Sequence, residues 1–211
     1  MSVDSAKNNN ECIAEGAPNP QAKCSDVILE PEIEEDPEPY PPWNFSWVVD
    51  NELACMAWPQ NTLNLDYLYD VGIRHLVTLS QEKMPPMEGY SKLEWTLLPV
   101  EEFEDPSIKQ IIQFMDICQS AIQKHQPVGV HCRMGRGRSG VMAACYLVKF
   151  KELTPERAIT DVRLLRPHSI ETPEQERVIF KYFDHVRGTI SGPPPPRQQN
   201  GTSTNVAQQQ P

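Results

Sequence analysis

Residues 127–140 read PVGVHCRMGRGRSG. The apolar run at 127–131 is typical of a short buried strand, and residues 139–151 carry the apolar spacing of a buried helix. Cys132 therefore stands between a strand and a helix, at the start of a loop that holds two glycines and three arginines. Because arginines are rarely buried without a partner, such a loop makes a poor core. The stretch predicts a functional loop in an α/β domain.

The chemistry of this loop suits a bound anion. A loop of backbone N–H groups before a helix N-terminus favours both a phosphate dianion and the Cys132 thiolate. Gly135 and Gly137 are expected to adopt positive φ, which turns successive amides inward. Arg138 can grip two phosphate oxygens with its planar guanidinium, and Ser139 can donate a hydrogen bond to the Cys132 sulfur. The residues predict nucleophilic attack by Cys132 on a phosphate ester.

The other loop residues are expected to assist binding. His131 is expected to order the loop through backbone hydrogen bonds, and Met134 belongs to the substrate-binding turn. Arg133 and Arg136 add positive charge to the rim beyond what one phosphate needs. They raise phosphoinositides, or another polyanion, as a rival substrate class. Alternatively, both arginines are rim or structural residues paired with nearby acids.

The surrounding chain alternates strands and helices. Apolar patterns predict further strands at 45–49, 53–57, 73–79 and 93–98. Helical spacing predicts helices at 63–71 and 107–124. Thr154-Pro155 and Thr172-Pro173 each place an N-cap before a proline at the start of a helix, and Gln175 is expected to complete a capping box. This order predicts one α/β domain with a central sheet flanked by helices.

A family resemblance rests on these residues. The loop resembles the HCxxGxxR[ST] signature of protein tyrosine phosphatases, and residues 43–187 are similar to the small atypical dual-specificity phosphatases. The similarity lies in residues 44–48, 72–77, 128–132, 144–149 and 165–172. It implies the single-domain phosphatase fold with a central mixed sheet. It also implies a location in the cytosol, with the nucleus as a further possible location. It also implies hydrolysis of phosphotyrosine and phosphoserine/threonine in proteins without metal or cofactor.

The resemblance leaves the proton donor open. Members of the family carry an acid, typically in Pro-Asp, on the loop after the strand that corresponds to 93–98. Glu102 takes this place here, which is a departure because its side chain is longer. Asp105 is a second acid on the loop, although it is expected rather to start the next helix. Glu171, on a turn expected to face the phosphate loop, is an alternative acid or a residue that positions water.

The ends of the chain differ in composition from its centre. The chain has 211 residues and a net charge of -10. Residues 1–42 hold ten acidic and two basic residues and many prolines, so they are predicted to be a disordered tail. The acidic charge argues against a nucleic-acid partner. The catalytic domain is predicted at 43–189, followed by a disordered Pro/Gln-rich tail at 190–211. There, Pro193 to Pro196 are either an SH3 or WW ligand or an inert linker.

Several observations bear on location and metal binding. The six cysteines show neither a disulfide framework nor the spacing of a zinc site. The sequence has no apolar run of about 18 residues and no apolar N-terminal stretch, so neither a transmembrane helix nor a signal peptide is expected. An intracellular protein with reduced thiols is expected.

Two other functions stay open. A pseudophosphatase would bind phosphopeptides without turnover. The presence of Cys132, Arg138 and Ser139 speaks against this interpretation, and the unusual acid loop keeps it open. A rhodanese-like sulfurtransferase also uses a cysteine in an anion-binding loop, but the ending Arg138-Ser139-Gly140 disfavours it. Among phosphatases, protein substrates are preferred over lipids because most of the chain resembles the protein phosphatases.

Overall fold

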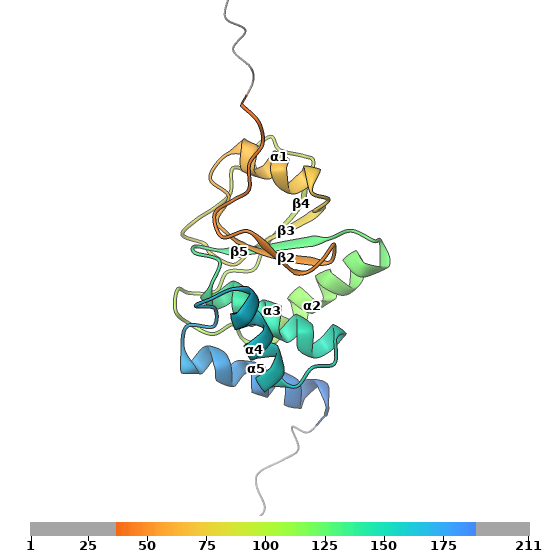
Figure 1. The fold of residues 1–211 in the computed structure, drawn as a ribbon, viewed down its shortest axis with the longest axis vertical. Helices are drawn as coiled ribbons and strands as arrows, with labels where there is room; N and C mark the ends of the chain where they lie inside the picture. The colour runs from red at the N-terminus through yellow and green to blue at the C-terminus, as the bar shows by residue number, and fades with distance from the viewer. Residues whose placement is uncertain (1–36, 189–211) are drawn as a thin grey trace, which may run out of the picture. The chain divides into compact units, whose positions relative to one another are not determined.

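The computed structural model describes residues 37–188 and places a five-stranded sheet at the centre (Figure 1). The strands, in the order β1-β2-β5-β3-β4, are Ser46–Val49, Leu53–Ala57, Val128–Cys132, His75–Thr78 and Glu94–Leu97. The edge strand β1 is antiparallel to β2, and the other neighbours are parallel. The predicted α/β domain with a central mixed sheet is confirmed.

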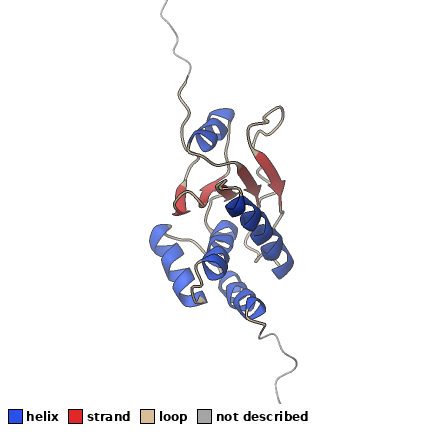
Figure 2. Cartoon of the chain, turned by 90° about the vertical axis from the view of Figure 1, so that its right-hand side faces the viewer, coloured by secondary structure: helices blue, strands red, loops and turns tan. Residues whose placement is uncertain are grey.

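Helices cover both faces of the sheet (Figures 1 and 2). Helix α1 (Thr62–Asp70) lies on one face. On the other lie α2 to α5, which span Ile108–Gln123, Gly137–Phe150, Pro155–Leu165 and Pro173–Val186. A sheet covered on both sides needs strands that are apolar on both faces. Strand β2 meets this need because all five of its residues are buried.

The core therefore divides into two clusters. Side chains alternate along β2, so Ala54 and Met56 pack in the cluster with Leu65 of α1, while Leu53 and Cys55 pack in the larger cluster with α2 to α5. The larger cluster includes most of α3, whose residues from Gly137 to Val148 are all buried. Helix α3 therefore lies between the sheet and the outer helices.

Local signals set most of the helix ends. Thr154 and Thr172 cap α4 and α5 as predicted, each accepting a backbone N–H with its side chain. The capping box expected at Thr172 forms only in part. The Thr172 side chain accepts the N–H of Gln175, but the Gln175 side chain accepts the N–H of Glu171 rather than that of Thr172. Asp105 does not start α2; Ser107 does, in a full capping box with Gln110.

The parallel strands end together at one edge of the sheet. Cys132, the last residue of β5, lies opposite Ala57, the last residue of β2, and Thr78 at the end of β3 lies opposite His131. In open α/β sheets, ligands bind outside the carboxyl ends of the strands. Helix α3 begins at Gly137 rather than at residue 139, so Arg138 and Ser139 lie in its first turn at this edge.

Residues 37–42, the last part of the predicted N-terminal tail, are among the described residues. The carbonyl of Tyr40 accepts a hydrogen bond from Asn64 at 3.0 Å, and Pro42 is buried. The rest of the predicted tails, including Pro193 to Pro196, lies outside the described residues. No helix within residues 37–188 is long and apolar enough to cross a membrane.

Candidate active site

The predicted nucleophile lies at the carboxyl end of the central strand. Cys132 is 3% exposed, and its Sγ lies 3.4 Å from the Oγ of Ser139 in the first turn of α3. This is the contact expected from the sequence. The hydroxyl can stabilise sulfur when it carries negative charge, because hydrogen bonds to ionised groups are the stronger ones.

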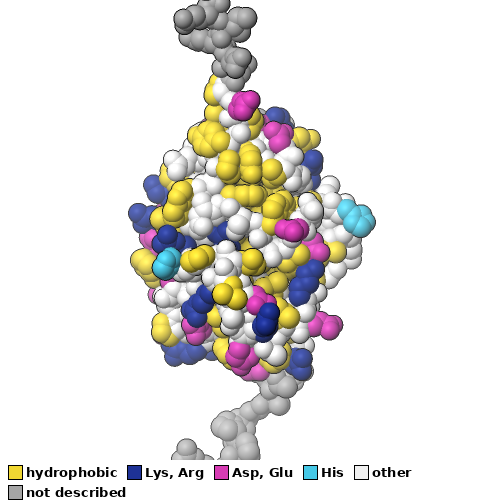
Figure 3. Space-filling model, in the orientation of Figure 1, with side chains coloured by type: hydrophobic (Ala, Val, Ile, Leu, Met, Phe, Trp, Pro, Cys, Tyr) yellow, Lys and Arg dark blue, Asp and Glu magenta, His cyan; other side chains and the backbone are white. Residues whose placement is uncertain are grey.

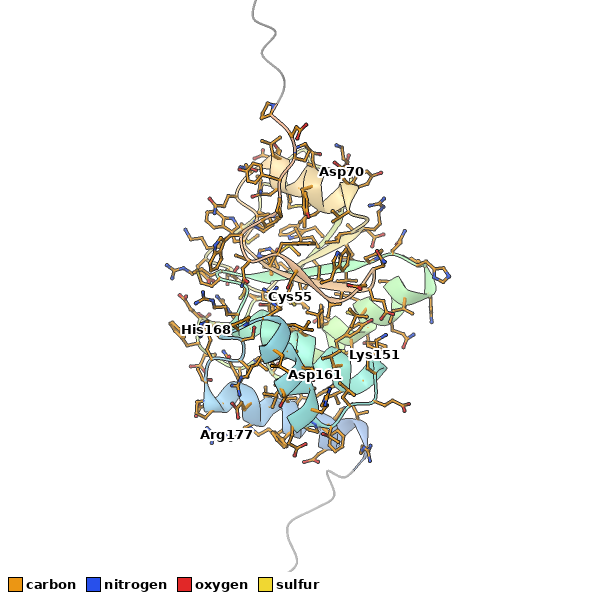
Figure 4. All side chains as sticks on the ribbon, viewed as in Figure 1. Cys55, Asp70, Lys151, Asp161, His168 and Arg177 are labelled. Atoms are coloured by element: carbon orange, nitrogen blue, oxygen red, sulfur yellow. The ribbon has the colours of Figure 1, made fainter. Side chains whose placement is uncertain are left out.

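The other described cysteines suit structural roles. Cys55, labelled in Figure 4, lies in β2, and burial raises the pKa of its thiol to about 11. Burial also raises the pKa of Cys118 and of Cys145 well above the ordinary value. A thiol of that kind is neither a nucleophile nor easily oxidised at neutral pH. The reactive candidate among the described cysteines is therefore Cys132.

The loop after Cys132 is held by hydrogen bonds to its carbonyls. Asn44 donates from Nδ2 to the carbonyls of Met134 and Gly135 at 3.0 and 3.2 Å, and Arg166 donates from Nη2 to the carbonyl of Gly135 at 2.7 Å. In a trans peptide the N–H points away from the carbonyl. The amides of Gly135 and Arg136 therefore face the opposite side, where an anion can bind. Neither Asn44 nor Arg166 was predicted to belong to the site.

The two loop glycines have different roles. Gly135 has the expected positive φ, 69°, and a Cβ there would lie 2.4 Å from the carbonyl carbon of Met56. Gly137 has no positive φ, so that prediction was wrong. Glycine is required at this position because there is no room for a side chain. A Cβ would lie 2.4 Å from Glu171 Oε2 and 2.9 Å from Gln175 Nε2. Gly137 thus lets these two side chains approach the loop.

Arg138 is fixed by partners from other loops. Its side chain is 4% exposed and pairs with Glu82 at 2.6 Å, and its Nη1 donates to the carbonyl of Val100 at 2.8 Å. Burial acts to raise the pKa of Glu82, but the hydrogen bonds and charge of Arg138 outweigh it and hold that pKa below its ordinary value. The planar guanidinium is therefore oriented before any phosphate binds. Sequence reasoning missed Glu82.

Both candidate proton donors lie at the pocket. The pocket has a volume of about 240 Å³ and is lined by Glu102, Phe103, Cys132, Arg133, Met134, Arg138, Glu171 and Gln175. Glu102 accepts hydrogen bonds from Arg133 with both carboxylate oxygens at 3.1 Å, which is the pairing expected if Arg133 is a rim residue. Asp105 does not line the pocket.

Gln175 connects the acid loop to the start of α5. It is fully buried, its Oε1 accepts the N–H of Glu171 at 2.8 Å, and its Nε2 donates to the carbonyl of Glu104 at 3.3 Å. An amide beside Cys132 can orient a water molecule for attack, because it offers both a donor and an acceptor. Sequence reasoning had assigned Gln175 only to a helix cap.

His131 is a structural residue beneath the loop. Its Nε2 lies 2.7 Å from Thr78 Oγ1, which also accepts a hydrogen bond from Trp95 Nε1 at 2.9 Å. Burial lowers the pKa of His131 to about 4, with a backbone contact at Cys132 opposing the shift. The ring is therefore neutral at physiological pH and is unsuited to proton transfer there.

A strand-to-helix loop with a cysteine at its start and a buried arginine in the following helical turn defines the class of cysteine-dependent phosphatases. The chain belongs to the family described as "Swiss Army Knife protein, DSP-PTPase phosphatase domain", whose model matches residues 42–179. The chain thus contains a phosphatase domain of the dual-specificity and tyrosine phosphatase superfamily.

Its relatives include lipid and protein phosphatases. The chain is 27% identical over 154 residues to human phosphatidylglycerophosphatase and protein-tyrosine phosphatase 1, a match that covers 68% of this chain and 77% of that protein. It is 29% identical over 140 residues to the Arabidopsis thaliana phosphatidylglycerophosphate phosphatase PTPMT1, covering 64% of this chain and 40% of the relative. Human dual specificity protein phosphatase CDC14C is 34% identical over 102 residues, which are 46% of this chain and 21% of that protein.

Solved structures share the fold. Tk-PTP in its active form superposes with a TM-score of 0.60 at 24% identity, covering 67% of this chain and 97% of that one. PTPMT1 in complex with PI(5)P superposes with a TM-score of 0.62 at 20% identity, covering 70% and 99%. Within residues 37–188 there is no group of three or more His, Cys, Asp or Glu side chains arranged to hold a metal ion.

Proposed function

We propose that this phosphatase removes phosphate from phosphotyrosine and from phosphoserine and phosphothreonine in proteins, through a phosphocysteine intermediate. The observation that carries the proposal is the shared pocket of Cys132 and Arg138, with Ser139 against the sulfur and Glu82 fixing the guanidinium. Preorganised charge of this kind lowers the barrier because it costs no reorganisation during the reaction.

In the first step the Cys132 thiolate attacks phosphorus and the bond from phosphorus to the ester oxygen breaks. The departing oxygen takes the electron pair of that bond and a proton from a carboxylic acid at the pocket. Glu102 is proposed as this donor, since it stands on the loop above the pocket and lines it. Arg133 must then release Glu102, and a bound phosphate offers Arg133 another anion.

In the second step a water molecule attacks phosphorus and the bond from sulfur to phosphorus breaks. The electron pair returns to Cys132, where the Ser139 hydroxyl stabilises the thiolate. Gln175 is proposed to orient the water, and the nearby Glu171 to accept its proton. Glu171 suits this role because its carboxylate lies against Gly137 in the loop. The reverse assignment of Glu102 and Glu171 is the alternative.

The exposed rim supports protein substrates. Phe103 is 65% exposed and Met134 is 42% exposed, and both line the pocket beside Cys132. Apolar side chains at the mouth suit an aromatic ring or the side chains next to a phosphorylated residue. We also propose kinship with dual specificity protein phosphatase 23, a small atypical phosphatase, because residues 43–187 resemble it in several stretches. A cytosolic location is part of the same proposal.

Phosphoinositides are the second candidate substrates. Two relatives carry names of phosphatidylglycerophosphate phosphatases, and one related structure holds PI(5)P. Arg136 adds a cation beside the loop that no carboxylate within residues 37–188 pairs with. These observations support a polyanionic substrate as the second candidate.

A phosphate-release panel tests the proposal. Phosphotyrosine peptides, phosphothreonine peptides and phosphoinositide vesicles are compared for wild type and Cys132→Ser, with binding of the same peptides measured by calorimetry. We expect release from both kinds of peptide by wild type only, with peptide binding retained in the variant. Phosphate release from vesicles alone would show that the substrates are lipids rather than proteins. Binding without release by wild type would identify a pseudophosphatase.

The paired variant Arg133→Ala/Arg136→Ala separates the two substrate classes further. If lipids are the true substrate, it should lose far more activity on vesicles than on phosphotyrosine peptides. Equal losses on both would favour proteins, because rim charge would then serve general anion binding.

A further inference from the structure

The loop that carries Glu82 is long and irregular. It comprises residues 79–93, between β3 and β4, and contains neither helix nor strand. Loops of this length without secondary structure are uncommon in compact domains and are often functional. Because Glu82 orients Arg138 from this loop, the geometry of that pair depends on where the loop backbone is held.

Glu82 also has more than one cation within reach. Burial acts to raise its pKa, and the causes that outweigh burial include the charge of Arg133 as well as the hydrogen bonds and charge of Arg138. Figure 3 shows Lys and Arg side chains along the left edge of the molecule, where the loop after β5 lies in Figure 1. The Glu82 side chain is 37% exposed, and holding an exposed ion pair in one geometry costs conformational entropy. The backbone beside Glu82 must therefore be fixed if the carboxylate is to stay on Arg138.

Trp58 contacts the two residues that follow Glu82. Its indole Nε1 donates to the carbonyl of Met84 at 2.9 Å, and Lys83 Nζ lies 4.6 Å from the centroid of its ring. An ammonium group over an indole is attracted by the ring electrons. The hydrogen bond and the ring contact therefore hold the same stretch of backbone.

Trp58 is itself attached to the phosphate loop. It follows Ala57, the last residue of β2, and its backbone N–H donates to the carbonyl of Arg133 at 3.4 Å. Arg133 is the residue directly after Cys132. Trp58 thus joins the loop that carries Glu82 to the residue next to the nucleophile.

The start of the same stretch is fixed by other contacts. The N–H of Val100 donates to the carbonyl of Leu79 at 2.9 Å, and Ser80 is fully buried. The Ser80 hydroxyl donates to the carbonyl of Lys83 at 3.2 Å, which closes a turn around residue 82. With Trp58 at the other end, the turn is held on both sides of its glutamate.

We propose that Trp58 is a positioning residue for the reaction: by holding the two residues after Glu82 against the end of β2, it keeps the Glu82 carboxylate on Arg138. The inference rests on the proposed chemistry of the pocket but not on the choice between protein and lipid substrates. Arg138 must face the phosphate both when it binds and when charge develops in the transition state. Loosening Trp58 should therefore impair both steps.

The test measures kcat/KM on an aryl phosphate and, by calorimetry, the binding of inorganic phosphate, which needs no turnover. Trp58→Phe removes the N–H donor and keeps an aromatic ring beside Lys83. We expect it to lower kcat/KM about fivefold and to weaken phosphate binding by a similar factor, which corresponds to the loss of one hydrogen bond. Lys83→Met keeps the indole and removes the cation, and should lower kcat/KM about threefold.

A double-mutant cycle with Glu82→Ala separates positioning from a general structural role. If Trp58 acts through Glu82, Trp58→Phe should have no further effect on kcat/KM or on phosphate binding when Glu82 is absent. Glu82→Gln, which keeps the size of the side chain, repeats the cycle. Trp47→Phe is the matched control, because this indole lies in β1 and packs on Phe45, and it should leave both measurements unchanged.

Equal losses for Trp58→Phe with and without Glu82 would overturn the inference, because Trp58 would then act on the fold or directly on the phosphate loop. Unchanged kcat/KM and phosphate binding in Trp58→Phe would overturn it as well. If wild type binds phosphate but releases none from the aryl phosphate, the proposed function fails. Phosphate binding that is weakened by Trp58→Phe only when Glu82 is present would still support the positioning role.

Discussion

At the scale of single residues, the burial of charge is the main free-energy cost of forming the site. A guanidinium as buried as that of Arg138 loses several kcal/mol of hydration unless partners compensate. Glu82 and the Val100 carbonyl provide that compensation, so the cost of orienting Arg138 is met on folding rather than during the reaction. Substrate phosphate then meets a donor that is already in place.

The two candidate proton donors can be separated by matched amide variants. Glu102→Gln should lower kcat on substrates with poor leaving groups by about a hundredfold and flatten the basic limb of the pH–rate profile, because the departing oxygen receives no proton. Glu171→Gln should instead slow the second step. The measurements are pH–rate profiles with phosphotyrosine peptide and burst kinetics with a good aryl leaving group.

A burst of leaving group followed by a slow steady rate is expected for Glu171→Gln, because the phosphocysteine accumulates. If Glu102→Gln shows an unchanged profile while Glu171→Gln loses the basic limb, the two roles are exchanged.

Residues of the site were predictable where they share one short motif. Cys132, Arg138 and Ser139 follow from the spacing of the loop, since the strand and helix on either side fix their geometry. Glu82 was not predictable because it meets Arg138 across 56 residues, and no local pattern distinguishes it from other exposed acids. Gln175 was not assigned to the site for another reason, which is that its position also fits a helix cap.

At the scale of elements, the N-terminus of α5 is expected to serve both stability and catalysis. Thr172→Ala should lower the free energy of unfolding by about 1 kcal/mol, because the N–H of Gln175 loses its acceptor. It should also lower kcat by roughly tenfold, since Gln175 and Glu171 shift at the pocket.

Thr154→Ala is the control for that variant. Thr154 caps α4 in the same way, before a proline, and neither it nor Arg157 lines the pocket. Chemical denaturation should show a similar loss of stability with unchanged kcat. Equal kcat in the two variants would contradict a catalytic role for the start of α5.

Three neighbouring strands share one hydrogen-bond chain, from Trp95 in β4 through Thr78 in β3 to His131 in β5. Because the pKa of His131 falls from 6.5 to about 4 on folding, the unfolded chain binds more protons between these values. Stability should therefore fall as pH drops from about 6.5 to about 4, by up to roughly 3 kcal/mol, and this contribution should be constant outside that window.

The pH dependence is measured by urea unfolding of wild type and His131→Asn, which cannot bind a proton at this position. Carboxylates titrate in both proteins, so the difference between the two curves isolates His131. A difference that does not change with pH would show that the histidine titrates alike in both states.

Local signals predicted the elements better than their arrangement. The N-caps at Thr154 and Thr172 act within one turn, so they can be read from adjacent residues. The neighbours β2 and β5 are separated by more than 70 residues along the chain, and their pairing follows from the packing of the whole core. The family resemblance implied a central mixed sheet, and the order of its strands was not predicted.

At the scale of the whole molecule, one side chain joins the antiparallel edge of the sheet to the phosphate loop. Arg166 follows α4 and is 2% exposed. It donates to the carbonyls of Asn44, Cys55 and Gly135 and to the hydroxyl of Ser46. These acceptors come from distant parts of the chain, so Arg166 makes the geometry of the loop depend on the complete fold.

Arg166→Met should lower the free energy of unfolding by roughly 3–5 kcal/mol, because several buried acceptors lose their donor at once. Arg177→Met removes an exposed arginine that pairs with Glu174 within α5, and it should cost less than about 1 kcal/mol. Thermal unfolding of both variants measures the difference. Similar melting temperatures would show that Arg166 contributes little to cohesion.

Gly135 lies so close to β2 that even a methyl group there would meet the backbone of Met56 and Ala57. Gly135→Ala should therefore displace the amides while leaving every reactive side chain in the sequence. Such a variant separates the thiol from the backbone amides around it. Alkylation of Cys132 by iodoacetamide should continue. Inorganic phosphate is expected to slow this alkylation in wild type and to have no effect on it in the variant. Continued protection by phosphate would mean that the sulfur and its neighbours suffice to hold the anion. Loss of protection would mean that anion binding beside Cys132 depends on the absence of a side chain at residue 135.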